Sequence, residues 1–132
     1  MAASRWRSIG FDLPERASRT TDYATVPAMH VLAALQAEID ERGAVARQLL
    51  KVEFNLGHGG ARVALREQPL PEDYPSLATV FGEIARACAQ DHIGADQLRS
   101  ITFEKDEVRL MLINGHGEPE AYIFPVRPNE AS

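Results

Sequence analysis

Two Gly-His-Gly tripeptides, at positions 57–59 and 115–117, each interrupt a stretch in which apolar and polar residues alternate. An alternation with a period of two predicts a strand that buries one face. Glycine adopts the positive φ angles that tight reversals need, so each tripeptide is predicted to form the tip of a β-hairpin. Two hairpins account for most of an antiparallel sheet, and this pair of tips constrains the fold more than any other feature of the chain.

Apolar residues at helical spacing precede the first hairpin and predict a helix. It is expected to start after Thr25, a candidate N-cap, with Pro27 in its first turn, and to end at Gly43. Its predicted apolar stripe comprises Met29, Leu32, Leu35 and Ile39.

A second helix is predicted between the proline-rich segment 69–75 and Gly94. After it, Ile101 to Glu104 is predicted to form a strand that turns tightly over residues 104–107 into the strand of the second hairpin. The apolar stripe of this helix is expected to comprise Leu77, Val80, Phe81, Ile84, Ala85 and Cys88.

The predicted order of elements is α-β-β-α-β-β-β. This order predicts an α+β two-layer sandwich, with an antiparallel sheet and two helices mainly on one face. Pro125 predicts that the last strand lies at an edge. Met111 and Ile113 add apolar residues to the second face of their strand, which predicts a central strand covered on both sides.

The predicted domain spans residues 26–126. Residues 1–25 are expected to form a loosely ordered extension or a short edge strand near Ile9 to Leu13, and residues 127–132 a tail. Helix, strand, Gly-His-Gly and strand occur in both halves at an offset of 58 residues. Because the residues around the two tripeptides do not match, convergent hairpin chemistry is a better explanation than duplication.

Charge is unevenly distributed along the chain. Residues 1–66 hold nine Lys or Arg against seven Asp or Glu, whereas residues 67–120 hold four against eleven, a balance of −7. Such a segment repels phosphate backbones and attracts basic surfaces, so a basic protein is a better partner prediction than nucleic acid. No run of about 20 apolar residues indicates a membrane span, and the single cysteine, Cys88, suits a reducing cytoplasm.

His58 and His116, in the two tripeptides, are candidate metal ligands. Imidazole binds zinc, copper and nickel, and two tips at one end of a sheet could approach each other. A third ligand would have to come from Glu118, Glu120 or His92. Because no spacing matches a known metal motif, we expect solvated turn residues, with no metal and no cofactor.

Cys88 and His92 lie four positions apart, on one face of the predicted second helix. A thiol beside an imidazole is the minimal arrangement for a cysteine nucleophile. Reactive cysteines favour helix N-termini, whereas Cys88 continues an apolar stripe near a C-terminus. We therefore expect Cys88 to be a core residue, His92 to meet the carbonyls that end the helix, and the protein to have no catalytic residue.

Carboxylates cluster in two segments that are predicted to be exposed loops. Charged groups around an aromatic residue are typical of an interface for a basic partner. The candidate partner-binding residues are Glu72, Asp73, Tyr74, Glu104, Asp106 and Glu107.

The plan of helix, hairpin, helix and meander over residues 28–126 resembles the small acidic immunity proteins that protect bacteria from polymorphic or contact-delivered toxins. The segment 98–112, Leu-Arg-Ser-Ile-Thr-Phe-Glu-Lys-Asp-Glu-Val-Arg-Leu-Met-Leu, is similar to a late strand, turn and strand of one such group. The resemblance implies a cytoplasmic inhibitor that binds and neutralises a cognate toxin domain, and it transfers no functional residue.

Two other functions fit the same sequence. A secretion chaperone of similar size would form a homodimer through an exposed apolar surface, for which Met111 and Ile113 are candidates. A small metal-binding or ligand-binding domain would use His58 and His116. The chain is expected to be a monomer or a homodimer.

Overall fold

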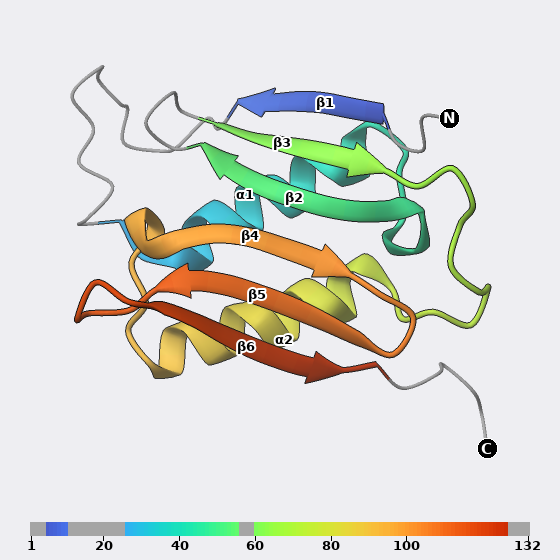
Figure 1. Ribbon diagram of the computed structural model, residues 1–132. Coiled ribbons are helices and arrows are strands. Elements are labelled where there is room, and N and C mark those ends of the chain that lie inside the picture. Colours follow the sequence, from blue (N-terminus) through green and yellow to red (C-terminus); the bar gives the residue numbers. More distant parts are fainter. Residues whose placement is uncertain (1–4, 11–25, 56–59, 127–132) are drawn as a thin grey trace.

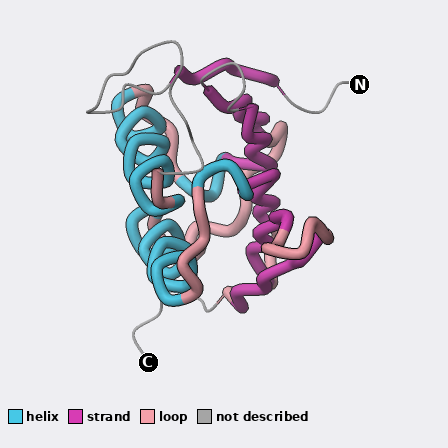
Figure 2. Tube along the Cα trace, turned by 90° about the vertical axis from the view of Figure 1, so that its left-hand side faces the viewer, coloured by secondary structure: helices cyan, strands magenta, loops and turns pink. Residues whose placement is uncertain are grey.

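The computed structural model describes residues 5–10, 26–55 and 60–126. Within these ranges the chain forms an antiparallel sheet of six strands, in the order β1-β3-β2-β4-β5-β6, and two α-helices. The helices α1 and α2 pack against each other on one face of the sheet (Figures 1 and 2). The predicted α+β sandwich and the order α-β-β-α-β-β-β, from α1 to β6, are confirmed.

The first helix, α1, spans Ala28–Glu41. Its N-cap is Pro27, which makes no side-chain capping bond, and Thr25, the expected cap, lies outside the described residues. Gly43 ends the helix as predicted, with a φ of 80°. Met29 is 41% exposed, so its placement in the apolar stripe was wrong. The residues that α1 buries are Ala28, Val31, Leu32, Leu35 and Ile39.

The second helix, α2, spans Leu77–Gln90 and has a conventional N-cap. The Ser76 side chain accepts a hydrogen bond from the Thr79 backbone N–H at 3.1 Å. Its predicted apolar stripe is confirmed, with Ala85 only partly buried. No helix in the described residues is long and apolar enough to cross a membrane.

The strands follow the alternation read from the sequence, with small shifts of boundary. The buried residues of β2 are Leu49 and Val52. The pairing with β3 shifts register between Leu49 and Lys51, and Leu50 is only half-buried. The bounds are Leu49–Asn55 for β2, Gly60–Leu65 for β3, Leu98–Phe103 for β4, Glu107–Ile113 for β5 and Pro119–Pro125 for β6.

The hairpin turns that the structure describes match the predictions. Gly117 has a φ of 79°, and the Asn114 N–H donates to the Glu118 carbonyl at 2.8 Å across the β5–β6 tip. The turn 104–107 closes with a bond of 2.9 Å from the Glu104 N–H to the Glu107 carbonyl. The first tripeptide, 57–59, lies outside the described residues, although β2 and β3 pair up to Asn55 and Gly60 on either side of it.

Strands β1 and β6 occupy the two ends of the sheet order. The edge position predicted from Pro125 is thereby confirmed for β6. Strand β1, Arg5–Gly10, starts earlier than the strand expected near Ile9 and pairs with β3. Residues 5–10 therefore belong to the sheet, so the domain extends beyond the predicted start at residue 26.

A structural repeat relates the two halves at an offset of 49 residues, from Ala28 to Leu77, and not at the offset of the two tripeptides. Each copy has a 14-residue helix, a 3₁₀ turn (η2, Ala46–Gln48, or η4, Ala95–Gln97) and two paired strands. Buried residues and their counterparts are Ala28 and Leu77, Val31 and Val80, Leu32 and Phe81, Leu35 and Ile84, Ile39 and Cys88, Ala46 and Ala95, Leu49 and Leu98, and Val52 and Ile101.

The connection from helix to strand uses the same hydrogen bonds in both copies. The Ile39 and Cys88 carbonyls accept from N–H groups five residues later, at 3.2 and 2.9 Å, as in a Schellman motif. The Gln48 and Gln97 side chains each accept from the backbone N–H three residues earlier at 2.9 Å. These contacts lead Ala-x-Gln-Leu into β2 in the first copy and into β4 in the second.

The two copies meet along a local two-fold axis. Strands β2 and β4 pair antiparallel with Val52 opposite Ile101, which are themselves counterparts. We call β1, α1, η2, β2 and β3 the first unit, and α2, η4, β4, β5 and β6 the second unit. The apolar faces of both helices and both hairpins form one core cluster between the layers.

Candidate functional site

The two acidic segments converge at one end of the sheet, where the loop after β3 meets the β4–β5 turn (Figure 1). The Tyr74 hydroxyl donates to the Glu104 backbone carbonyl at 3.0 Å and joins the loop to the turn. We call Glu72, Asp73, Glu104, Asp106 and Glu107 the acidic end. All of these side chains are exposed except Glu107, which is half-buried.

Tyr74 was predicted to be an exposed aromatic contact residue, but its ring is buried. Its side chain is 7% exposed and belongs to the core cluster. Burial, the largest cause, raises the pKa of Tyr74 to about 12, so the hydroxyl keeps its proton and its bond to Glu104 at neutral pH. Tyr74 is therefore a positioning residue that holds the two acidic segments together.

Basic groups neutralise only part of this region. Arg109 Nη2 forms a salt bridge of 2.8 Å with Glu107 Oε2, and Arg66 Nη1 donates to the Phe103 carbonyl at 3.1 Å. Residues 104–126 hold five Asp or Glu against two Lys or Arg, a balance of −3. The five carboxylates of the acidic end against Arg66, Lys105 and Arg109 leave a balance of −2 there, and Glu118 and Glu120 add negative charge at the opposite end of β5 and β6.

Apolar side chains occupy the sheet face opposite the helices at β5 and β6. The register places Met111 beside Ala121 and Arg109 beside Ile123, on the same face of the two strands. Ile123 is 46% exposed, Ala121 is exposed, and Met111 and Ile113 are half-buried. We call Met111, Ile113, Ala121 and Ile123 the apolar sheet face.

The helices cover only the other face (Figure 2), so the expectation that β5 is covered on both sides is wrong for the described residues. Strand β5 is flanked by β4 and β6, and its inward residues are fully buried. Its outward residues lack a second layer among residues 5–10, 26–55 and 60–126. Ile123 was not among the predicted contact residues, although its alternation with Tyr122 and Phe124 indicated two apolar faces.

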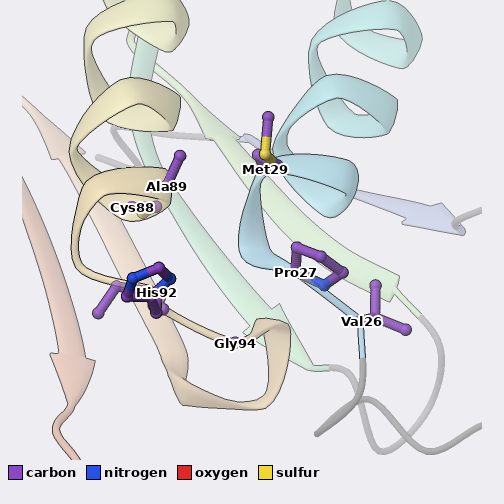
Figure 3. Close-up of a pocket in the computed structure, with 8 residues that line it drawn as sticks. Val26, Pro27, Met29, Cys88, Ala89, His92 and Gly94 are labelled. Atoms are coloured by element: carbon purple, nitrogen blue, oxygen red, sulfur yellow. The ribbon is translucent and has the colours of Figure 1, made fainter.

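A pocket of about 370 Å³ lies between the start of α1 and the end of α2 (Figure 3). Cys88 contributes to its wall, but its side chain is 1% exposed and burial raises its pKa to about 11. The thiol therefore stays protonated at neutral pH and lacks the thiolate that a nucleophile needs. Its prediction as a core residue is confirmed.

His92 ends α2 through its backbone, at the position that Gly43 occupies after α1. Its φ is 55°, and its N–H donates to the Ala89 carbonyl at 3.3 Å. The side chain is exposed at the rim of the pocket (Figure 3). The contact with the helix C-terminus is therefore made by the His92 main chain.

The candidate metal ligands do not form a described site. His116 is exposed in the β5–β6 turn, where its backbone N–H donates to Asn114 Oδ1 at 2.8 Å. His58 lies outside the described residues. Among the described residues no group of three or more His, Cys, Asp or Glu side chains is placed to hold a metal ion.

A further contact joins strand β6 to the helix layer. The Tyr122 hydroxyl donates to Asp91 Oδ2 at 2.5 Å and ties β6 to the end of α2. This bond, the largest cause, raises the pKa of Tyr122 to about 12.

No protein-family model, no curated protein and no solved structure matches the chain.

Proposed function

We propose that this protein is a non-catalytic binding protein that neutralises a basic partner, in the manner of an immunity protein bound to its cognate toxin domain. The observation that supports the proposal is the convergence of two acidic segments, about 30 residues apart, at one end of the sheet. Tyr74 and Glu104 hold these segments together, so their charges act as one surface.

Charge complementarity would serve speed and selectivity of binding. An acidic surface attracts a basic partner over about a Debye length, roughly 8 Å at physiological salt. Steering of this kind raises the association rate and excludes acidic competitors. An inhibitor that must capture a toxin before it acts benefits most from a fast association.

The test starts from the gene next to that of this chain, which the proposal expects to encode a basic toxin domain. Co-expression with the intact protein should restore growth, and the purified proteins should bind with a dissociation constant that weakens as salt rises. The variant Glu72→Lys with Asp73→Lys should lower the association rate at least 10-fold. Its matched control is Glu83→Lys with Asp96→Lys, two exposed acidic residues outside the acidic end.

Equal association rates for the two double variants, or growth that is not restored by the intact protein, would contradict the proposal. Circular dichroism of each variant before the binding measurement shows whether it is folded. Because all four substituted side chains are exposed, we expect the melting temperatures to remain close to that of the unaltered protein.

A second candidate function is a homodimeric secretion chaperone. The observation that favours it is the apolar sheet face, in which Ile123 is 46% exposed beside Met111 and Ala121. Sedimentation equilibrium distinguishes the two functions, because a chaperone of this type should be a dimer at micromolar concentration and should give no protection against a toxin.

A further inference from the structure

We infer that the apolar sheet face is the hydrophobic centre of the partner's binding site, which runs from the acidic end along the outer surface of β5 and β6. This inference rests on the proposed function and specifies the surface that the partner must carry. The partner would place an apolar protrusion against Met111 and Ile123, with lysine or arginine side chains around it.

The comparison of the two units singles out this face. The register makes Lys51 and Glu53 of the first unit the counterparts of Ser100 and Thr102 of the second. Lys51 and Glu53 form a salt bridge of 3.4 Å on the outer face of β2. The second unit has the uncharged polar residues Ser100 and Thr102 at these positions. Because the first unit carries charged residues there, the shared fold does not require an apolar outer face.

A similar contrast holds in the next strand. Ala64 of β3 and Met111 of β5 occupy equivalent register positions, opposite Lys51 and Ser100 respectively. Ala64 is fully buried, whereas Met111 is half-buried and lies beside the exposed Ala121. The larger side chain therefore stands where it can contact another molecule, and the smaller one does not.

The acidic end continues directly into this face. Glu107 and Arg109 are outward residues of β5, and Met111 and Ile113 follow them on the same side of the strand. Glu118 is exposed and precedes Pro119, the first residue of β6, at the other end of the face. An apolar centre with a charged rim is the usual anatomy of a protein interface.

Charge decides which occupant fits. Residues 104–126 carry a balance of −3, so two copies stacked through this face would bring two negative rims together. A basic partner gains attraction from the same rim. Pro119 and Pro125 begin and end β6 and lack an N–H, which disfavours a second copy adding a strand to this edge.

The experiment uses the purified, catalytically inactive toxin domain encoded beside the gene, as in the test of the proposed function. The variants are Ile123→Ser and Met111→Ser, and the matched control is Val45→Ser. Val45 is 48% exposed and lies in the first unit, so its truncation removes a similar apolar area outside the proposed site.

Ile123→Ser should raise the dissociation rate about 10-fold or more and leave the salt dependence of association unchanged, because apolar contacts act after encounter. Val45→Ser should bind as the unaltered protein does. The charge variants of the acidic end should show the opposite pattern, with a slower association and a weaker salt dependence.

The outcomes separate the inference from the proposed function. If the intact protein does not bind the toxin domain, both fail. If the charge variants weaken binding and Ile123→Ser does not, the proposed function stands and the inference is wrong. If Ile123→Ser converts a sedimenting dimer to a monomer without changing toxin binding, the face is an interface between copies and the inference is likewise overturned.

Discussion

The first and second units share a frame but differ in what they present outside it. Both bury the same positions, end their helices with the same backbone bonds and lead through Ala-x-Gln-Leu into the central strands. On the outer sheet face, however, the first unit carries the Lys51–Glu53 pair, while the second carries Met111 and Ile123. Because the two units share one fold, residues that are alike in both are those that the fold requires. Residues that differ between the units are not required by the fold.

The phenylalanines at the ends of β2 and β4 offer the largest test of the comparison. Phe103 is fully buried and stacks on Phe81 with ring centroids 6.3 Å apart, whereas its counterpart Phe54 is only partly buried. Phe103→Ala should lower the free energy of unfolding by about 3–5 kcal/mol. Phe54→Ala should lower the free energy of unfolding by clearly less, as measured by urea denaturation. Equal losses in the two variants would show that both phenylalanines contribute equally to the core.

Exchange of the counterparts on the outer face should give the next largest effect. Ala64 has no exposed surface, so Ala64→Met should overpack its site and cost about 1–3 kcal/mol. Met111→Ala should cost less than about 1.5 kcal/mol, because Met111 is only half-buried. Thermal denaturation of both variants checks the difference. A stable Ala64→Met protein would mean that the two outer faces are interchangeable.

Tyr74 joins the loop that leaves the first unit to the hairpin of the second. Tyr74→Phe should cost about 1 kcal/mol through loss of the bond to Glu104. The raised pKa favours the neutral hydroxyl in the folded state, so this stabilisation is present below about pH 10 and is lost as pH rises toward about 12.

The alkaline loss of stability should therefore be shallower in Tyr74→Phe than in the unaltered protein. Tyr122→Phe should show the same change, since the pKa of Tyr122 is also raised to about 12, by its bond to Asp91. Denaturant midpoints between pH 8 and 11 measure both effects. An unchanged pH profile in both variants would contradict the assignment.

The helix ends provide the smallest test. Gly43 and His92 occupy equivalent left-handed positions, with φ of 80° and 55°, and only glycine adopts this conformation without strain from a Cβ atom. His92→Gly should raise the free energy of unfolding by up to about 1 kcal/mol, and Gly43→Ala should lower it by about the same amount. Opposite signs in chemical denaturation support the equivalence, and equal signs refute it.

Much of the secondary structure could be predicted, because its signals are local. The alternation around Val52 and Leu110 marked strands, the spacing of Leu77 to Cys88 marked a helix, and Pro125 marked an edge. The repeat was missed because the two Gly-His-Gly tripeptides suggested an offset of 58. Its true signal, Ala-x-Gln-Leu at positions 46–49 and 95–98, lies before each hairpin.

The candidate site could be predicted only in part. The acidic residues were found from charge alone, but Tyr74 is buried in the core cluster and its hydroxyl bonds to the Glu104 carbonyl, 30 residues away. Met29 has the spacing of a core residue, yet α1 is oriented so that Ala28 and Val31 face the sheet in its place. The orientation of a helix relative to the sheet is set by packing between elements. The periodicity of residues within one element does not predict it.

The sequence by itself determined where the chain forms strands, turns and helices, since hydrophobic periodicity and glycine conformation act over a few residues. Only the tertiary structure decided that β2 pairs with β4 about a local two-fold axis, that the acidic segments meet, and that Ile123 is 46% exposed. The physical reason is that these features come from contacts between distant segments, where burial of shared apolar surface selects one arrangement among several that local propensity permits.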